Sequence, residues 1–281
     1  MKKSIVVGSV LSLLVCGGCF KYREAPHRPV TVTTLAEAVA KKDTVERVNL
    51  SDQVIGVLPQ ELASMPKLSI LLLRKSTGIS SLAVLPSLKA LKTLDLSSAN
   101  VSDVPAEVFA LEGLEQLYLV DNGIATLAPG IGGMKSLTYL NLDRNQLATL
   151  PATLGDVTGL RWLRLNENKL TALPPELAKL VELQNIYLRQ NQLTGVPECL
   201  KGLALLENIS LSGNQIAEIP QWMTGLPKLR ALDLDGCPVA KLPEKLDGWK
   251  TLQVLSLVRC SISDAEKTRL RAALPKVHIA F

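Results

Sequence analysis

The stretch that decides the fold is Leu160-Arg-Trp-Leu163-Arg-Leu165-Asn-Glu-Asn168-Lys-Leu170-Thr-Ala-Leu173-Pro174. Leu163 and Leu165 alternate with polar residues, as the buried face of a strand does. Further along, Leu173, Leu177 and Leu180 recur at spacings of four and three residues, which is typical of a helical turn. The unit therefore predicts a strand, a turn and a short helical or 3-10 return.

The same pattern returns every 23 residues through most of the chain. The second strand leucine occurs in ten consecutive registers, at Leu50, Leu73, Leu96, Leu119, Leu142, Leu165, Leu188, Leu211, Leu234 and Leu257. A unit of this size cannot bury its leucine face alone, so neighbouring units must stack. We expect ten repeats over residues 45–274, forming an α/β solenoid with one continuous core and a parallel sheet.

The composition supports a repeated core and argues against several functions. Leucine supplies 54 of the 281 residues, whereas Phe, Trp and Tyr total only 10. A core built mostly of one side chain indicates one packing environment repeated many times. The formal net charge of +5 is too mild to indicate nucleic-acid binding. Only His27 and His278 are present, and no catalytic or metal-binding motif occurs, so we expect no enzyme activity, cofactor or metal.

The repeat resembles the 23-residue leucine-rich repeat, LxxLxLxxNxLxxLPxxLxxL. The stretch from Leu160 to Pro174 matches this pattern closely, and the resemblance covers about residues 45–274. It implies a curved horseshoe with its parallel sheet on the concave face. It also implies a binding scaffold, because this fold by itself carries no particular chemistry.

The ninth position of the repeat holds residues suited to a hydrogen-bonded ladder. Its members are Gln53, Ser76 and Ala99, followed by Asn122, Asn145, Asn168, Asn191, Asn214, Cys237 and Cys260. An inward Asn can donate to and accept from the buried backbone, and stacked copies form a ladder. Because the first three members are not Asn, we expect a looser N-terminal end. The two cysteines are expected to be buried thiols, with a disulfide as the alternative.

Both ends of the solenoid carry capping signals. Thr34-Leu-Ala-Glu37 fits a capping box that opens a helix in an N-terminal cap at residues 34–44. Ser263-Asp-Ala-Glu266 fits a second box, which opens a helix in a C-terminal cap at residues 264–281. Alternating apolar residues at the end of this cap predict a short final strand. Solenoids require such terminal covers.

Residues 1–18 have the pattern of an export signal. A basic start precedes an apolar run of eleven residues, too short for a bilayer core of roughly 30 Å. Gly17-Gly18 before Cys19 resembles the bacterial lipoprotein signal, in which the cysteine becomes the lipidated first residue. We therefore expect lipid on Cys19 and a tether over residues 19–33. The protein would be exported and held on a membrane of the bacterial cell envelope.

One surface carries a distinctive set of side chains. Strand residues that alternate away from the core face the concavity. Over four consecutive repeats these positions hold Tyr118, Tyr139, Trp162 and Tyr187, with Arg164, Arg189, Asp143 and Glu167 around them. Tyr, Trp and Arg together are typical of binding hot spots, although aromatic residues also suit strands in general. We interpret this set as a partner-binding surface.

Three functions are compatible with this surface. The first is binding of a protein or peptide across the concave face. The second is binding of carbohydrate or cell wall, in which the aromatic rings would stack on sugars. The third is a structural envelope spacer without a ligand. The unbroken 23-residue period offers no insertion to build a narrow glycan groove, so we favour a monomeric protein-binding scaffold.

Overall fold

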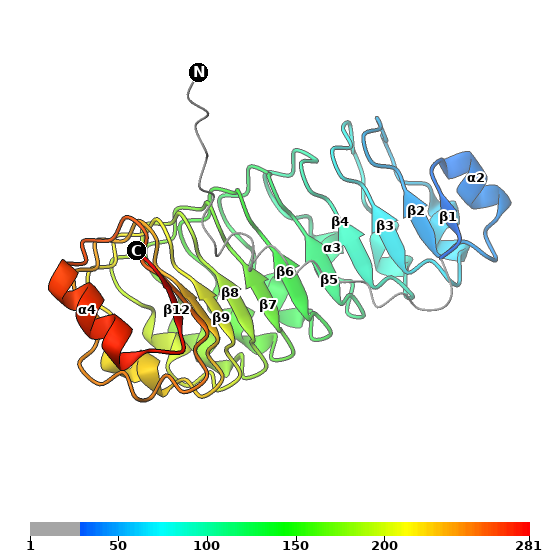
Figure 1. The fold of residues 1–281 in the computed structure, drawn as a ribbon. Helices are drawn as coiled ribbons and strands as arrows, with labels where there is room; N and C mark the ends of the chain where they lie inside the picture. The colour runs from blue at the N-terminus through cyan, green and yellow to red at the C-terminus, as the bar shows by residue number, and fades with distance from the viewer. Residues whose placement is uncertain (1–28) are drawn as a thin grey trace, which may run out of the picture.

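The computed structural model describes residues 29–281. Within them, twelve parallel strands form one sheet whose spatial order equals their chain order (Figure 1). The repeat strands are β2 Arg47–Asn49, β3 Ile70–Leu72, β4 Thr93–Asp95, β5 Gln116–Tyr118, β6 Tyr139–Asn141, β7 Trp162–Arg164, β8 Asn185–Tyr187, β9 Asn208–Ser210, β10 Ala231–Asp233 and β11 Val254–Ser256. Leu140 pairs with Leu163, one period later, so equivalent side chains stack along the solenoid. The predicted fold is confirmed.

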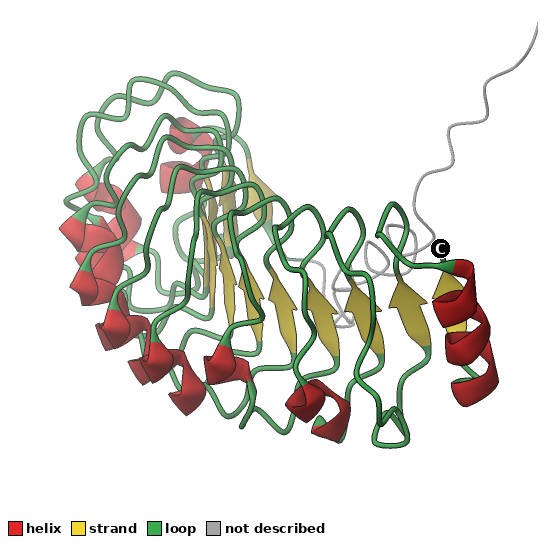
Figure 2. Ribbon diagram, turned by 90° about the vertical axis from the view of Figure 1, so that its left-hand side faces the viewer, coloured by secondary structure: helices red, strands yellow, loops and turns green. Residues whose placement is uncertain are grey.

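Most repeats return along the other side through a short helix. These helices are η2 Gln60–Ser64, η3 Leu85–Ser87, α3 Ala106–Phe109, η4 Pro129–Gly133, η5 Ala152–Asp156, η6 Pro175–Lys179, η7 Glu198–Leu200 and η8 Gln221–Gly225, and all except α3 are 3-10 helices. An extended proline precedes most of them, as Pro151 does before η5; its fixed φ and missing N–H suit a helix start. Helices are wider than strands, so the stack curves with the helices on its convex side (Figure 2).

Columns of leucine fill the space between the sheet and the convex helices. Leu137, Leu140 and Leu142, all from one repeat, have no exposed surface. The apolar cluster to which they belong is continuous from Val32 to Leu274. Burying each such side chain contributes about 1.5–3 kcal/mol, and only stacked repeats can provide that burial.

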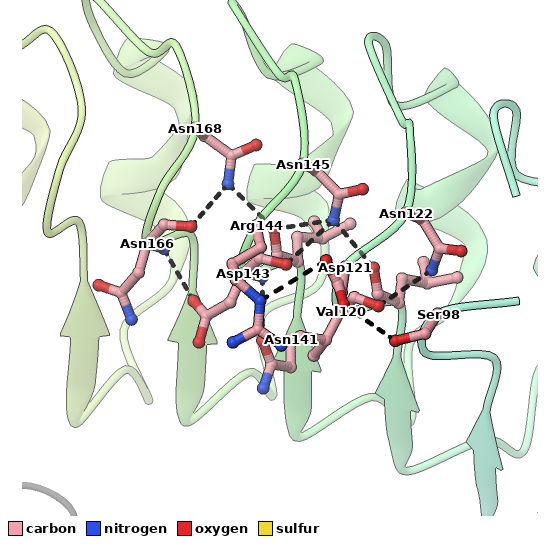
Figure 3. Close-up of polar contacts among 12 residues, drawn as sticks. Ser98, Val120, Asp121, Asn122, Asn141, Asp143, Arg144, Asn145, Asn166 and Asn168 are labelled. Atoms are coloured by element: carbon pink, nitrogen blue, oxygen red, sulfur yellow. Dashed lines mark hydrogen bonds and ion pairs between the residues drawn. The ribbon is translucent and has the colours of Figure 1, made fainter. Parts of the chain in front are cut away.

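The asparagine side chains form a ladder beside this core (Figure 3). Asn168 Nδ2 donates to the carbonyls of Leu142 at 3.0 Å and Leu165 at 3.1 Å. Its Oδ1 accepts from the N–H of Leu147 at 3.0 Å. Equivalent bonds are made by Asn122, Asn145, Asn191 and Asn214. Each rung therefore joins its own repeat to the one before it.

The residue before each rung has a left-handed backbone. The residues are Asp52, Lys75, Ser98, Asp121, Arg144, Glu167, Gln190, Gly213, Gly236 and Arg259. Only Gly213 and Gly236 adopt positive φ without a steric cost, which for other residues is roughly 1–2 kcal/mol. Before the Asn rungs the turn persists because the rung that follows it is held by several hydrogen bonds, as Asn145 and Asn168 are.

Cys237 and Cys260 continue the ladder as free thiols. Their Sγ atoms donate to the carbonyls of Leu211 at 3.3 Å and Leu234 at 3.1 Å. The thiol can make the donor contact of an Asn rung but is a weaker donor. The structure thus contains the thiol form that we favour over the disulfide.

Burial protects the cysteines chemically. It raises the pKa of Cys199 to about 11 and that of Cys260 to about 12, and it also raises the pKa of Cys237. At pH 8 only about one in 1000 thiols with a pKa near 11 is the reactive thiolate.

We expect iodoacetamide at pH 8 to leave all three unmodified in the native protein and to alkylate them in guanidinium chloride. Peptide mapping by mass spectrometry measures this, and rapid native alkylation of Cys260 would contradict it.

The first two repeats are joined in another way. Ser76 Oγ reaches the carbonyl of Leu50 at 2.8 Å, but no Asn is present to continue the ladder. Instead, the loops after β2 and β3 pair directly through parallel bridges between Val54 and Thr77 and between Val57 and Ser81. The sequence predicts a looser N-terminal end, whereas backbone pairing replaces the missing rungs between these two repeats.

Caps cover both ends of the solenoid. They consist of β1 Thr31–Val32 and α2 Leu35–Ala40 at one end, and α4 Asp264–Ala273 and β12 His278–Ala280 at the other. Thr34 Oγ1 accepts from the N–H of Glu37 at 3.1 Å. Ser263 Oγ accepts from the N–H of Glu266 at 3.2 Å. Each side chain satisfies an N–H group that the first helical turn leaves open, so both helices begin where their capping signals lie.

The predicted tether over residues 19–33 is too long. Thr31 and Val32 pair with Arg47 and Val48 as strand β1, and Val32 is 1% exposed. The last residues of the expected tether therefore belong to the folded solenoid, because an apolar residue beside the first repeat strand gains by burial. The predicted signal peptide, Cys19 and the rest of the tether lie outside the described residues. Between residues 29 and 281, no helix has the length and apolar character to cross a membrane.

Candidate binding surface on the concave sheet

Four aromatic side chains from neighbouring strands form a row, which we call the aromatic row. Tyr118 lies on β5, Tyr139 on β6, Trp162 on β7 and Tyr187 on β8. Successive ring centroids are 4.8, 6.4 and 6.2 Å apart. Tyr139 is directly opposite Trp162 in the sheet, and strand spacing brings such neighbours within ring contact. The parallel register thus assembles the row from residues far apart in sequence.

The rings of the aromatic row are in contact with one another at moderate angles. The angles between successive ring planes are 34°, 31° and 22°. Contacts of this kind contribute about 0.5–1.5 kcal/mol per pair. Tyr118, Tyr139 and Trp162 are nevertheless only half-buried. Part of each of these three side chains therefore remains accessible.

Tyr187 is not the accessible anchor that the sequence predicts. Its side chain is only 4% exposed. The ring of Trp162 stacks on it, and the guanidinium carbon of Arg164 lies 4.9 Å from its ring centroid. Tyr187 lies outside the leucine core, and these two neighbours pack on its ring. Its role in the surface is to support Trp162 and Arg164.

Arg164 and Asp143 form a close ion pair beside the aromatic row. Arg164 Nε donates to Asp143 Oδ2 at 2.8 Å, and Asp143 Oδ1 accepts from the N–H of Asn166 at 2.8 Å. Burial acts to lower the pKa of Arg164, but the charge and hydrogen bond of Asp143 outweigh it and raise that pKa, so the guanidinium stays charged. Asp143 is only 6% exposed. It positions Arg164 and is not the contact residue that the sequence predicts.

Arg189 and Glu167 lie at the edge of the surface. Both are exposed and occupy turns just after strands β8 and β7. Glu167 is one of the left-handed residues that precede a rung. Within the described part of the chain, neither side chain has a hydrogen bond or ion pair to the aromatic row. The structure thus brings together the four rings, Arg164 and Asp143, and leaves these two charges at the rim.

Polar side chains continue the concave face beyond the aromatic row. Asn208 Nδ2 donates to Asn185 Oδ1 at 2.6 Å, and Ser210 Oγ donates to Asp233 Oδ2 at 2.8 Å. Burial raises the pKa of Asp233. Asn185, Asn208 and Asp233 do not stand out in the sequence, because they belong to no aromatic or charged cluster. Comparison of each strand position down the repeats would have placed these polar side chains opposite one another.

The groups on this surface can make apolar contacts, hydrogen bonds and ion pairs. It combines half-buried aromatic rings with a fixed positive charge and a neighbouring polar network. Among residues 29–281, no group of three or more His, Cys, Asp or Glu side chains is arranged to hold a metal ion. The arrangement supplies shape, apolar contact area and hydrogen-bonding groups.

A curved parallel-sheet solenoid with a leucine core and an asparagine ladder defines a horseshoe-shaped repeat protein. The family model for the leucine rich repeat matches residues 89–147, 158–216 and 197–239. The chain belongs to the leucine-rich repeat family, whose members are generally non-catalytic binding scaffolds. No curated protein matches the chain significantly.

Solved structures show the same architecture. A leucine-rich repeat protein of Leptospira interrogans is 30% identical, with a TM-score of 0.59, over 90% of this chain and 75% of that chain. An internalin of Listeria monocytogenes is 22% identical, with a TM-score of 0.69, over 89% of this chain and 77% of that chain. The ectodomain of a membrane receptor kinase of Arabidopsis thaliana is 23% identical, with a TM-score of 0.69, over 89% of this chain and 33% of that chain.

Proposed function

We propose that this protein is a non-catalytic scaffold that binds a protein or peptide on its concave face. The observation that carries the proposal is the aromatic row with Arg164 held beside it. Tyr, Trp and Arg dominate the energetics of many interfaces when they are buried by a partner. Arg164 is already positioned by Asp143, so its ordering cost is met before a partner arrives.

The orientation of the rings favours a protein over a carbohydrate. Stacking on sugar requires a free aromatic face, and the contacts between successive rings reduce the ring area left for it. Ring edges, tyrosine hydroxyls and a guanidinium instead suit carbonyl and carboxylate groups of a polypeptide. The Arabidopsis receptor ectodomain, which is similar in fold, was solved in complex with Casparian strip integrity factor 2, and this supports a binding role for the architecture.

The binding test uses Trp162→Ala. Trp162 is half-buried at the centre of the aromatic row and contacts Tyr139 and Tyr187. Once a partner has been captured with the wild-type protein and identified, we expect this change to weaken its affinity by about tenfold or more. Isothermal titration calorimetry with the purified partner measures the affinity, and circular dichroism checks that the fold is retained.

The matched control is Trp222→Ala on the convex side. Trp222 lies in η8 and donates its Nε1–H to Glu198 at 2.8 Å. This variant removes a tryptophan of similar exposure from the opposite face, and it should bind the partner like wild type. Loss of binding in Trp222→Ala together with normal binding in Trp162→Ala would show that the partner binds the convex side, and it would contradict the proposal.

We also propose that the protein is exported as a lipoprotein and acts as a membrane-anchored monomer of the bacterial cell envelope. The support is the signal-like pattern in residues 1–18 and the glycines that precede Cys19. A lipid there would leave only a short spacer before strand β1 at Thr31. The solenoid would then be held close to the membrane by its N-terminal cap.

The anchoring test uses Cys19→Ser. Because the thiol is the acceptor for lipid in such signals, we expect this change to move the protein from the membrane fraction to a soluble or uncleaved form. Cell fractionation and mass spectrometry of the mature N-terminus provide the readout, with Cys199→Ser as the matched control. An unmodified wild-type N-terminus, or equal fractionation of the Cys19 variant and wild type, would refute the proposal.

A further inference from the structure

A cavity opens between the second and third repeats, away from the concave face. Its volume is about 330 Å³. It is lined by the loop after β3, including Ile79, Ser80 and Leu82, by the loop after β4, including Ala99 and Asp103, and by Glu107 of α3. This position is distinct from the aromatic row, whose first member lies on β5.

The cavity lies where the connection between repeats is interrupted. In four later repeats the residue after the rung donates its N–H to the preceding repeat, as Gln146 does to Ile124 and Lys169 does to Leu147. At this junction the rung is Ala99, which has no side-chain amide to donate or accept, and Asn100 is left-handed with φ 58°. The equivalent bond from Asn100 to the second repeat is not formed within the described chain. The two loops therefore separate.

One wall of the cavity is a segment that pairs as a strand does. The segment that follows β3 pairs in parallel with the first repeat at Thr77 and at Ser81. On the cavity side, the backbone N–H and C=O of Ile79 have no partner in the described residues. Such an open edge is what an extended peptide completes when it adds to a sheet.

The charged side chains that line the cavity are all acidic. Asp103 and Glu107 are its charged members, and no Lys or Arg is among the lining residues. Buried Leu82 and Leu96 provide an apolar floor, while exposed Ser80 and Ser102 provide hydroxyl groups at the entrance. This combination suits a short chain with apolar contacts and one positive side chain.

We propose that this cavity binds an extended peptide segment that carries a Lys or Arg side chain. The peptide backbone would bond to the open groups of Ile79 and Asn100 and so replace the missing connection between repeats. Its cationic side chain would be paired with Asp103 and Glu107. This is a second binding site, separate from the concave surface.

The test is fluorescence anisotropy with the full chain in detergent and two labelled probe peptides, Ser-Val-Lys-Val-Ser and Ser-Val-Gln-Val-Ser. We expect the Lys probe to bind about fivefold more tightly, as two solvent-exposed ion pairs allow. The double variant Asp103→Asn with Glu107→Gln should remove this difference. Ser80→Trp, which fills the cavity from an exposed position, should weaken binding of the Lys probe by about tenfold.

Two further variants make the result decisive. Ser102→Lys places a cation in the lining without filling the cavity, so it should also weaken binding of the Lys probe if Ser80→Trp does not fold. Trp162→Ala should leave Lys-probe binding unchanged, which separates this site from the concave surface. Equal affinity for the two probes would overturn the proposal, as would Lys-probe binding that survives both cavity variants or is lost in Trp162→Ala.

Discussion

Asn168→Leu is expected to lower the free energy of unfolding by about 3 kcal/mol. Leucine has nearly the same volume but can neither donate nor accept a hydrogen bond. The Leu147 N–H donates to Asn168 Oδ1 and has no other acceptor among the described residues. The carbonyls of Leu142 and Leu165 each keep a second donor, Asn145 and Asn191 respectively. The largest part of the cost is therefore one orphaned N–H group, with the loss of several weaker contacts added to it.

Gln53→Leu is the control for this prediction. Gln53 occupies the same position of the first repeat, but it is exposed and makes one bond, to the carbonyl of Thr33 at 2.9 Å. We expect a loss of less than about 1 kcal/mol. Urea unfolding followed by circular dichroism compares the two variants. A Gln53 variant less stable than the Asn168 variant would refute the ladder as a major source of stability.

Gly155→Ala is expected to destabilise the protein by about 2–3 kcal/mol. Gly155 lies in η5, where a Cβ atom would collide with the backbone carbonyl of Glu176 in the next 3-10 helix. A backbone carbonyl cannot move aside as a flexible side chain can, so the two convex helices must separate. Separation of one pair strains the stacking of the leucines beneath both.

The matched control is Gly133→Ala, in η4 of the preceding repeat. A Cβ atom there would meet nothing within 4 Å, and the backbone is not left-handed. We expect this variant to be as stable as wild type or slightly more stable, because Ala reduces the freedom of the unfolded chain. Thermal unfolding of both variants measures the difference. Equal melting temperatures would show that close convex packing does not limit stability.

The repeat architecture is readable from the sequence because one contact set is copied many times. Leu140 and Leu142 alternate in the strand, and the period of 23 residues gives the partner of every strand residue without ambiguity. The same arithmetic places Tyr139 beside Trp162. What depends on the repeated backbone can therefore be predicted from spacing alone.

The burial of individual surface side chains is not readable in this way. Tyr187 and Asp143 alternate away from the core, yet both are buried, and Arg164 contacts each of them across the concave face. Strand position determines the face on which a residue lies. The conformations of long neighbouring side chains determine whether that residue is accessible.

The irregular N-terminal repeats mark the other limit of prediction. The absence of Asn at positions 76 and 99 indicates that the ladder is interrupted. It does not indicate that the loops of the first two repeats pair directly, or that the loops of the second and third separate around a cavity. Those outcomes depend on left-handed residues such as Gly78 and Asn100. Their effect on the direction of a loop cannot be predicted from the repeat pattern.

The central claim, that a polypeptide partner lies on the aromatic row, is tested most directly by site-specific photo-crosslinking. A benzophenone amino acid at position 118, where the half-buried Tyr118 ends the row, is compared with the same group at position 222 on the convex side. We predict a covalent adduct with the captured partner from position 118 and none from position 222. An adduct from position 222 alone would contradict the assignment of the binding surface to the concave sheet.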